Sequence, residues 1–181
     1  MIGRNMPGWI DSLKARLGRA IGRRERPDVY NDLRSTALAI DPGSIEIPDG
    51  ESWSGAAMAA MEFGLAGGTA TIVAIADGTV SMYVSTGGGV IGAGEHAAVR
   101  GAAERFRTVV AESRNLLQVS NELPAAGMVR FHLRTVDGAY SAAAPEALLR
   151  TSRHPLAPLY AAGQDLLTEI RLSTPGSDRP T

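Results

Sequence analysis

The sequence predicts an α+β domain in which a central antiparallel sheet, built from two hairpins, is flanked by helices. Two observations lead to this fold class. Asp-Gly pairs at 77–78 and 137–138 each join two β-rich runs, and such a pair is a strong short-range signal for a hairpin. Between the hairpins, apolar residues recur at i, i+3 and i+4 over residues 95–119, which indicates one long helix.

Length and composition set the domain organisation. A chain of 181 residues is long enough for one domain with a substantial core and additional tails. We expect an N-terminal helix at 1–27, a single α+β domain at 28–172 and a flexible polar tail at 173–181. The sequence has no cysteine, which excludes disulfides, thiolate nucleophiles and cysteine metal sites.

The N-terminal segment has the pattern of a basic amphipathic helix. Residues 1–27 contain seven basic and two acidic residues, a net charge of +5, whereas the remaining eleven basic and seventeen acidic residues give −6. Three roles are open to such a helix: contact with an anionic membrane surface, binding in a partner's groove, or packing on its own domain. The short basic cluster and acidic body argue against nucleic-acid binding. The contact residues would be Trp9, Ile10, Leu13, Leu17 and Ile21, with Lys14, Arg16 and Arg19 between them.

Two further helices are predicted before the first hairpin. Asp28 is the N-cap of a short helix over 29–38, which ends at the Asp41-Pro-Gly43 sequence. Residues 44–48 form a short edge strand or an extended linker, because Pro48 cannot donate to a sheet. A second helix, rich in Ala and Met, runs over 53–65 and stops at Gly67-Gly68.

The two strands of the first hairpin differ in pattern. Residues 69–76 are largely apolar at successive positions, which predicts a central strand covered on both sides. Residues 79–86 alternate, with Val80, Met82 and Val84 on one face and Ser81, Tyr83 and Ser85 on the other. This alternation predicts a half-buried strand.

The glycine run at 87–94 has two interpretations. Gly87, Gly89 and Gly92 fit the G-x-G-x-x-G pattern of dinucleotide-binding proteins, and Glu112 follows at the distance of a ribose-binding acid. That site would require 107–112 to form the second parallel strand. The helical periodicity continues through these residues, so we expect helix there and assign the glycines to backbone bending or close approach. A nucleotide-binding enzyme remains the alternative function.

The second hairpin begins at Met128. Val129, Phe131 and Leu133 alternate with Arg130, His132 and Arg134, and the Arg-His-Arg face either accepts an anion or, as we expect, is solvated. Residues 145–149 form a helical turn or a last strand. A C-terminal helix over 156–170 follows, interrupted by Gly163.

No site chemistry stands out in the sequence. His96, His132 and His154 are far apart, without the spacing of metal ligands, and we expect them to be surface or hydrogen-bonded residues. We expect no catalytic residues, no metal and no cofactor. The sequence has neither the apolar core of a signal peptide nor a run long enough to span a membrane, which predicts a cytoplasmic protein that attaches at most to a membrane surface.

The order of elements from Trp53 onward resembles the roadblock/dynein light chain-type domain of the profilin-like group. The hairpin at 69–86, the helix at 95–119 and the strands at 128–143 carry this resemblance. The family usually has a third strand after the second helix, which here would have to come from 148–151, and the glycine run is unusually long. The resemblance implies a non-catalytic regulator or scaffold that forms homodimers and engages a protein such as a small GTPase.

Overall fold

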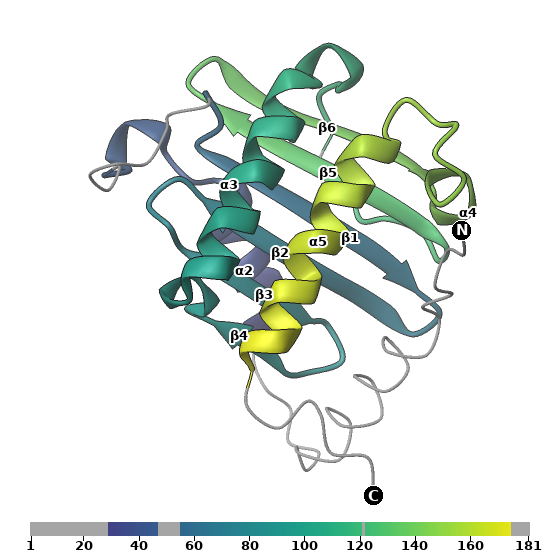
Figure 1. Ribbon diagram of the computed structural model, residues 1–181. Coiled ribbons are helices and arrows are strands. Elements are labelled where there is room, and N and C mark those ends of the chain that lie inside the picture. The colour runs from purple at the N-terminus through teal and green to yellow at the C-terminus, as the bar shows by residue number, and fades with distance from the viewer. Residues whose placement is uncertain (1–28, 47–54, 121, 175–181) are drawn as a thin grey trace, which may run out of the picture.

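A computed structural model of the chain describes residues 29–46, 55–120 and 122–174. Within this part of the chain, six strands form one antiparallel sheet in the order β4-β3-β2-β1-β5-β6 (Figure 1). The first four strands form a meander, and the last two form a hairpin that joins it beside β1. The strands are β1 (Met58–Leu65), β2 (Gly68–Ile75), β3 (Val80–Val84), β4 (Gly89–Ile91), β5 (Met128–Thr135) and β6 (Gly138–Pro145).

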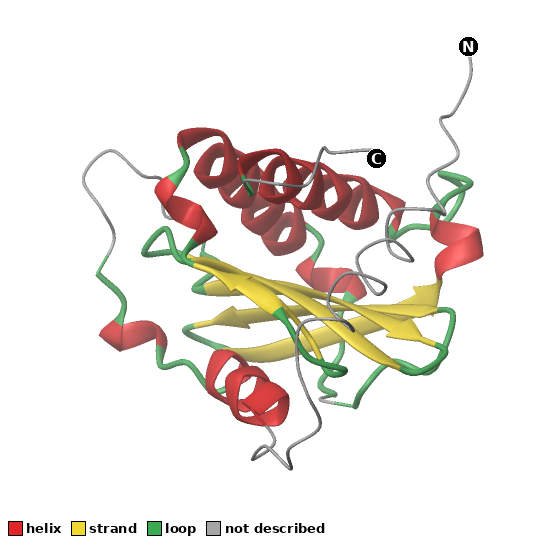
Figure 2. Ribbon diagram, turned by 90° about the horizontal axis from the view of Figure 1, so that it is seen from below, coloured by secondary structure: helices red, strands yellow, loops and turns green. Residues whose placement is uncertain are grey.

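Helices cover both faces of the sheet. The two long helices α3 (Ala97–Glu112) and α5 (Ala157–Ser173) lie side by side across one face, and α2 (Val29–Leu38) lies on the other (Figure 2). This arrangement confirms the predicted α+β class with a central antiparallel sheet. In the part of the chain that the structure describes, the remaining elements are α4 (Glu146–Leu149) and three short 3₁₀ helices, η1 (Pro42–Ser44), η2 (Ala93–Glu95) and η3 (Arg114–Leu116).

The main core lies between the sheet and the pair α3/α5. Alternate residues of the strands point into it, among them Met61 of β1 and Phe131 of β5, which are fully buried. Gly163 of α5 faces Met61 so closely that an added Cβ would lie 2.4 Å from its Cε atom. The helix therefore needs a glycine here to approach the sheet, and α5 runs through Gly163 without the predicted interruption.

Two helical glycines give a matched pair of predictions. We expect Gly163→Ala to destabilise the protein by about 1–2 kcal/mol, because overpacking against Met61 outweighs the gain in helix propensity. We expect Gly101→Ala in α3 to stabilise it by about 0.5–1 kcal/mol, since the nearest atom to its Cβ is the flexible end of Arg105 at 3.4 Å. Urea denaturation of both variants measures the difference, and equal effects would contradict the close approach of α5.

Both predicted hairpins are present. β2 and β3 are joined by the Asp77-Gly78 turn, where Asp77 accepts a hydrogen bond from the Thr79 amide at 2.8 Å and Gly78 has a φ of 87°. β2 lies inside the sheet with a strand on each side, as its apolar pattern predicted. In the second hairpin Thr135 pairs with Gly138, so the turn begins one residue before the Asp-Gly pair.

The helix predicted over 53–65 is wrong. Residues 58–65 form β1, which pairs with both β2 and β5 near the middle of the sheet, and Trp53 is outside the described residues. Every residue of β1 except Leu65 is buried. A short run that is apolar on both faces fits a buried strand and a buried helix equally well, and here tertiary packing overrides the helix propensity of Ala and Met.

Other predicted elements need smaller corrections. The long helix predicted over 95–119 ends at Glu112 and is followed by η3, after which Gln118 pairs with Ser141 of the edge strand β6. Residues 148–149 belong to α4, so they supply no third strand. α2 ends at Leu38, three residues before the predicted stop at Asp41-Pro-Gly43, where η1 begins, and residues 45–46 form no strand. Asp28 and Pro48 lie outside the described residues.

Candidate functional site

The two faces of the sheet are chemically different. The face toward α3 and α5 is lined by apolar side chains, whereas the face toward α2 carries buried polar and charged ones. We call the latter the α2 face. Its buried apolar residues form a separate small cluster of Tyr30, Met58, Ala60, Val73 and Tyr83. Its buried polar residues are Glu62, Thr69, Thr71, His132 and Ser141.

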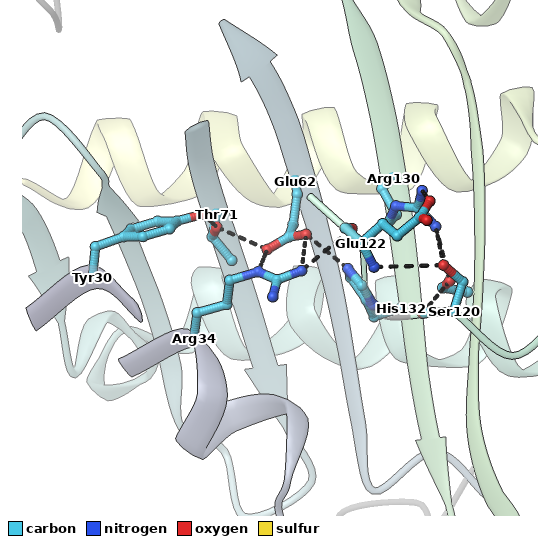
Figure 3. A network of polar contacts seen from close by, with 9 residues as sticks. Tyr30, Arg34, Glu62, Thr71, Ser120, Glu122, Arg130 and His132 are labelled. Atoms are coloured by element: carbon cyan, nitrogen blue, oxygen red, sulfur yellow. Dashed lines mark hydrogen bonds and ion pairs between the residues drawn. The ribbon is translucent and has the colours of Figure 1, made fainter. Parts of the chain in front are cut away.

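Glu62 of β1 is the centre of a polar cluster on this face, which we call the Glu62 group (Figure 3). Its carboxylate is completely buried and accepts two hydrogen bonds from Arg34 of α2, from Nε at 2.6 Å and from Nη2 at 3.0 Å. His132 of β5 lies opposite, with Nε2 at 2.8 Å from Oε2. Thr71 of β2 donates its hydroxyl to Oε1 at 3.2 Å and pairs with the Tyr30 hydroxyl at 2.8 Å. Three elements besides β1 therefore converge on one carboxylate.

A second group of polar residues continues from His132 toward β6. Arg130 of β5 donates to the hydroxyls of Ser120 and Ser141, at 3.1 and 3.2 Å, and lies 3.5 Å from the carboxylate of Glu122. The segment that carries Ser120 and Glu122 reaches α2, because the Glu122 carbonyl accepts a bond from Arg34 at 3.4 Å. The Arg-His-Arg face of β5 is thus not solvated as predicted. His132 is buried, and its anion is Glu62 of the same chain.

The pKa of Glu62 reflects this environment. Burial raises the pKa, but the hydrogen bonds from His132 and Arg34 and the charges of those partners outweigh burial and lower it to about 2 from an ordinary 4.5. The carboxylate is therefore ionised throughout the physiological range. Burial also raises the pKa of the nearby Tyr83 hydroxyl, which has no hydrogen-bond partner among the described residues.

The bonding of Glu62 decides what the site does chemically. Its two oxygens accept four hydrogen bonds, two from Arg34, one from Thr71 and one from His132. With its acceptor positions occupied and its pKa lowered, this carboxylate is a poor general base and a poor metal ligand. The arrangement instead fixes α2 to β1 and β5.

Acid should weaken the protein through Glu62. A folded-state pKa below the ordinary value means that the ionised carboxylate stabilises the fold above about pH 4.5 and loses this contribution as pH falls toward 2. We expect the free energy of unfolding of the wild type, relative to Glu62→Gln, to fall by about 3 kcal/mol across that range. Urea denaturation at several pH values measures it. Parallel pH profiles for the two proteins would contradict the assignment.

The glycine run does not form the geometry that a dinucleotide site requires. Residues 107–112, which would have to be a parallel strand, lie within α3, and β4 pairs antiparallel with β3. Backbone geometry accounts for all five glycines of the run. Gly87, Gly88 and Gly92 have positive φ. A Cβ on Gly89 would lie 2.3 Å from the Met82 carbonyl oxygen, and one on Gly94 would lie 1.9 Å from that of Gly78. Glu112 lies at the last turn of α3, far along the chain from these turns.

The remaining predicted site residues are placed as follows. His96 caps the start of α3 without a side-chain bond, and His154 accepts a hydrogen bond from the Leu156 amide at 3.2 Å. No group of three or more possible metal ligands occurs among the described residues, and no described helix is long and apolar enough to cross a membrane. The predicted contact residues of the N-terminal helix, from Trp9 to Ile21, lie outside the described residues.

Sequence reasoning did not find the Glu62 group. The available signal was a single acid within an otherwise apolar run, residues 56–65, which indicates a buried charge that needs a partner. The alternation of β5 indicates that Arg130 and His132 could accept an anion, but the carboxylate comes from a residue 70 positions away.

Known proteins offer no guide to this site. Comparisons with protein-family models, curated proteins and solved structures found no match. The resemblance to roadblock-type domains stays a prediction that none of the three comparisons tests.

Proposed function

We propose that the chain is a non-catalytic binding domain that acts as a homodimer through protein–protein contacts, in a regulatory or scaffold role. The α2 face of the sheet carries this proposal. Within the described residues, one helix of ten residues and the segment that carries Ser120 and Glu122 cover this face, whereas two long helices cover the apolar one. A domain that needed the sheet only as a scaffold would be expected to seal both faces with apolar side chains.

The composition of the α2 face supports a binding role. Tyrosine, arginine and methionine are enriched at protein interfaces, and tyrosine and arginine dominate their energetics. Here Tyr30 and Tyr83 pack edge to face with ring centroids 5.7 Å apart, beside Met58 and the Arg34–Glu62 pair. The opposite face has a different chemistry, because nearly all of its buried strand residues are the aliphatic, Met and Phe side chains of the main core.

Sedimentation equilibrium over a wide range of concentrations tests the dimer. We expect a reversible dimer at twice the chain mass of 18.9 kDa. A single species at the monomer mass over the whole range would reject the homodimer. Capture of purified small GTPases by the immobilised protein, in each nucleotide state, tests the partner class that the roadblock resemblance implies.

The alternative function is a nucleotide-binding enzyme that uses the glycines at 87–94. Thermal-shift measurements distinguish it from the binding-domain proposal. Under the binding-domain proposal, nucleotides and flavins leave the melting temperature of the wild type unchanged, and Gly89→Ala does not alter that result. A reproducible stabilisation by one nucleotide, lost in Gly89→Ala, would favour the alternative.

The basic N-terminal segment is proposed to hold the domain to an anionic membrane surface. Its net charge of +5 and its apolar positions motivate this role. In pelleting experiments with anionic vesicles, we expect the full chain to bind and a chain that starts at Pro27 to remain in solution. Equal behaviour of the two chains would reject a role for residues 1–26 in membrane contact.

A further inference from the structure

α2 packs on the sheet through a small apolar cluster of its own. Tyr30 is the only buried residue of this helix, and Leu33, Ala37 and Leu38 are partly buried against the same cluster. The cluster is separate from the main core, which lies on the other face of the sheet under α3 and α5. The apolar contacts that hold the rest of the domain together would therefore survive the loss of α2.

The polar contacts of α2 are concentrated on two side chains. Arg34 forms a two-bond ion pair with Glu62 of β1, at 2.6 and 3.0 Å, and the Tyr30 hydroxyl pairs with that of Thr71 of β2 at 2.8 Å. A bidentate pair between charged groups is the stronger of these two contacts. A helix of ten residues is too short to be stable in water by itself, so its helical form depends on these contacts and on the small cluster.

The sheet side of this contact keeps its own bonds when α2 is removed. Glu62 still accepts hydrogen bonds from His132 at 2.8 Å and from Thr71 at 3.2 Å, and both donors belong to the sheet. The neighbouring covering segment is held separately, because Ser141 of β6 donates to the Ser120 carbonyl at 2.6 Å. Without α2, water would reach the Glu62 carboxylate, and the newly exposed apolar surface would be that of one small cluster.

From these contacts we propose that α2 is a detachable cover of the α2 face. It leaves the sheet and binds it again while the sheet, α3 and α5 stay folded, and the Arg34–Glu62 ion pair is the main contact that holds it closed. The detached state exposes the face to which the proposed function assigns binding. The inference depends on contacts within one chain, so a strict monomer in sedimentation would reject the proposed homodimer and leave this inference standing.

Native-state hydrogen exchange of the wild type tests the detachment. Local opening of α2 exposes little surface, so its amides should exchange at a rate that is nearly independent of low urea concentrations. The amides of Phe106 and Val110 in α3, whose side chains are fully buried in the main core, should instead depend steeply on urea. Relative to intrinsic rates, we expect exchange in α2 to be on the order of 100-fold faster than in α3. The same urea dependence in both helices would overturn the proposal.

Two variants separate local from global opening. Gly163→Ala destabilises the main core, which persists when α2 detaches, so exchange in α3 should accelerate roughly tenfold while exchange in α2 stays unchanged. Arg34→Gln breaks the ion pair with the fully buried Glu62, so exchange in α2 should accelerate on the order of 100-fold.

The two variants also define the results that contradict the proposal. Equal acceleration of α2 and α3 in Gly163→Ala would mean that α2 opens only when the whole domain unfolds, which overturns the detachment. Unchanged exchange of α2 in Arg34→Gln would overturn the assignment of the ion pair as the contact that holds α2 closed.

Discussion

Glu62→Ala is expected to lower the free energy of unfolding by about 3–5 kcal/mol, the range measured when one partner of a buried ion pair is removed. The substitution deletes a completely buried carboxylate and leaves Arg34, whose side chain is 12% exposed, and His132, at 3%, without this anion. Much of the loss arises from these two groups, because a buried donor without an acceptor keeps its full cost of desolvation. Urea denaturation monitored by circular dichroism measures the effect.

Glu122→Ala is the matched control for Glu62→Ala. It also removes a glutamate that pairs with an arginine on the α2 face, but its carboxylate is 83% exposed and lies 3.5 Å from Arg130. Such a pair contributes at most about 1 kcal/mol. We therefore expect Glu62→Ala to lower the free energy of unfolding clearly more than Glu122→Ala does. If Glu62→Ala lost no more stability than Glu122→Ala, the Glu62 group would not be what fixes α2 to the sheet.

The parts of the fold that the sequence predicted are those encoded locally. Each Asp-Gly pair lies at a turn between strands that are neighbours along the chain, and the periodicity of residues 97–112 reports one helix face. β1 was missed because its neighbours β2 and β5 cover both of its edges and helices cover both of its faces. Burial on all sides removes the alternation by which a strand is recognised.

The candidate site was missed for a related reason. Arg130, His132 and Arg134 share one face of β5, and alternation alone identifies that face as polar without showing what lies above it. The covering residues come from α2, which is distant in sequence, and from Ser120 and Glu122, which lie in the connection just before β5. A solvated face and a buried ion-pair face have the same local pattern. They differ only in tertiary contacts, which a single sequence does not contain.

Gly64→Ala is expected to cost about 2–4 kcal/mol, at the upper end of overpacking effects. Gly64 lies two residues after Glu62 on β1 and therefore points to the same α2 face. The segment that covers this face passes directly over it, and an added Cβ would lie 1.8 Å from the Ala125 carbonyl oxygen and 2.8 Å from that of Pro124. Both contacts are with backbone atoms, so the clash can be relieved only by moving the segment.

That displacement should also be visible locally. The Gly127 amide donates to the Gly64 carbonyl at 2.9 Å, so hydrogen exchange at Gly127 should accelerate in Gly64→Ala beyond the change in global stability. Gly67→Ala is the control, because that glycine lies in the next turn with no atom within 4 Å of its Cβ position, and its stability should change by less than about 0.5 kcal/mol. Indistinguishable behaviour of the two variants would mean that the covering segment is not packed on β1. The hydrogen bond from Arg34 to the Glu122 carbonyl depends on the same packing, so it would then not form.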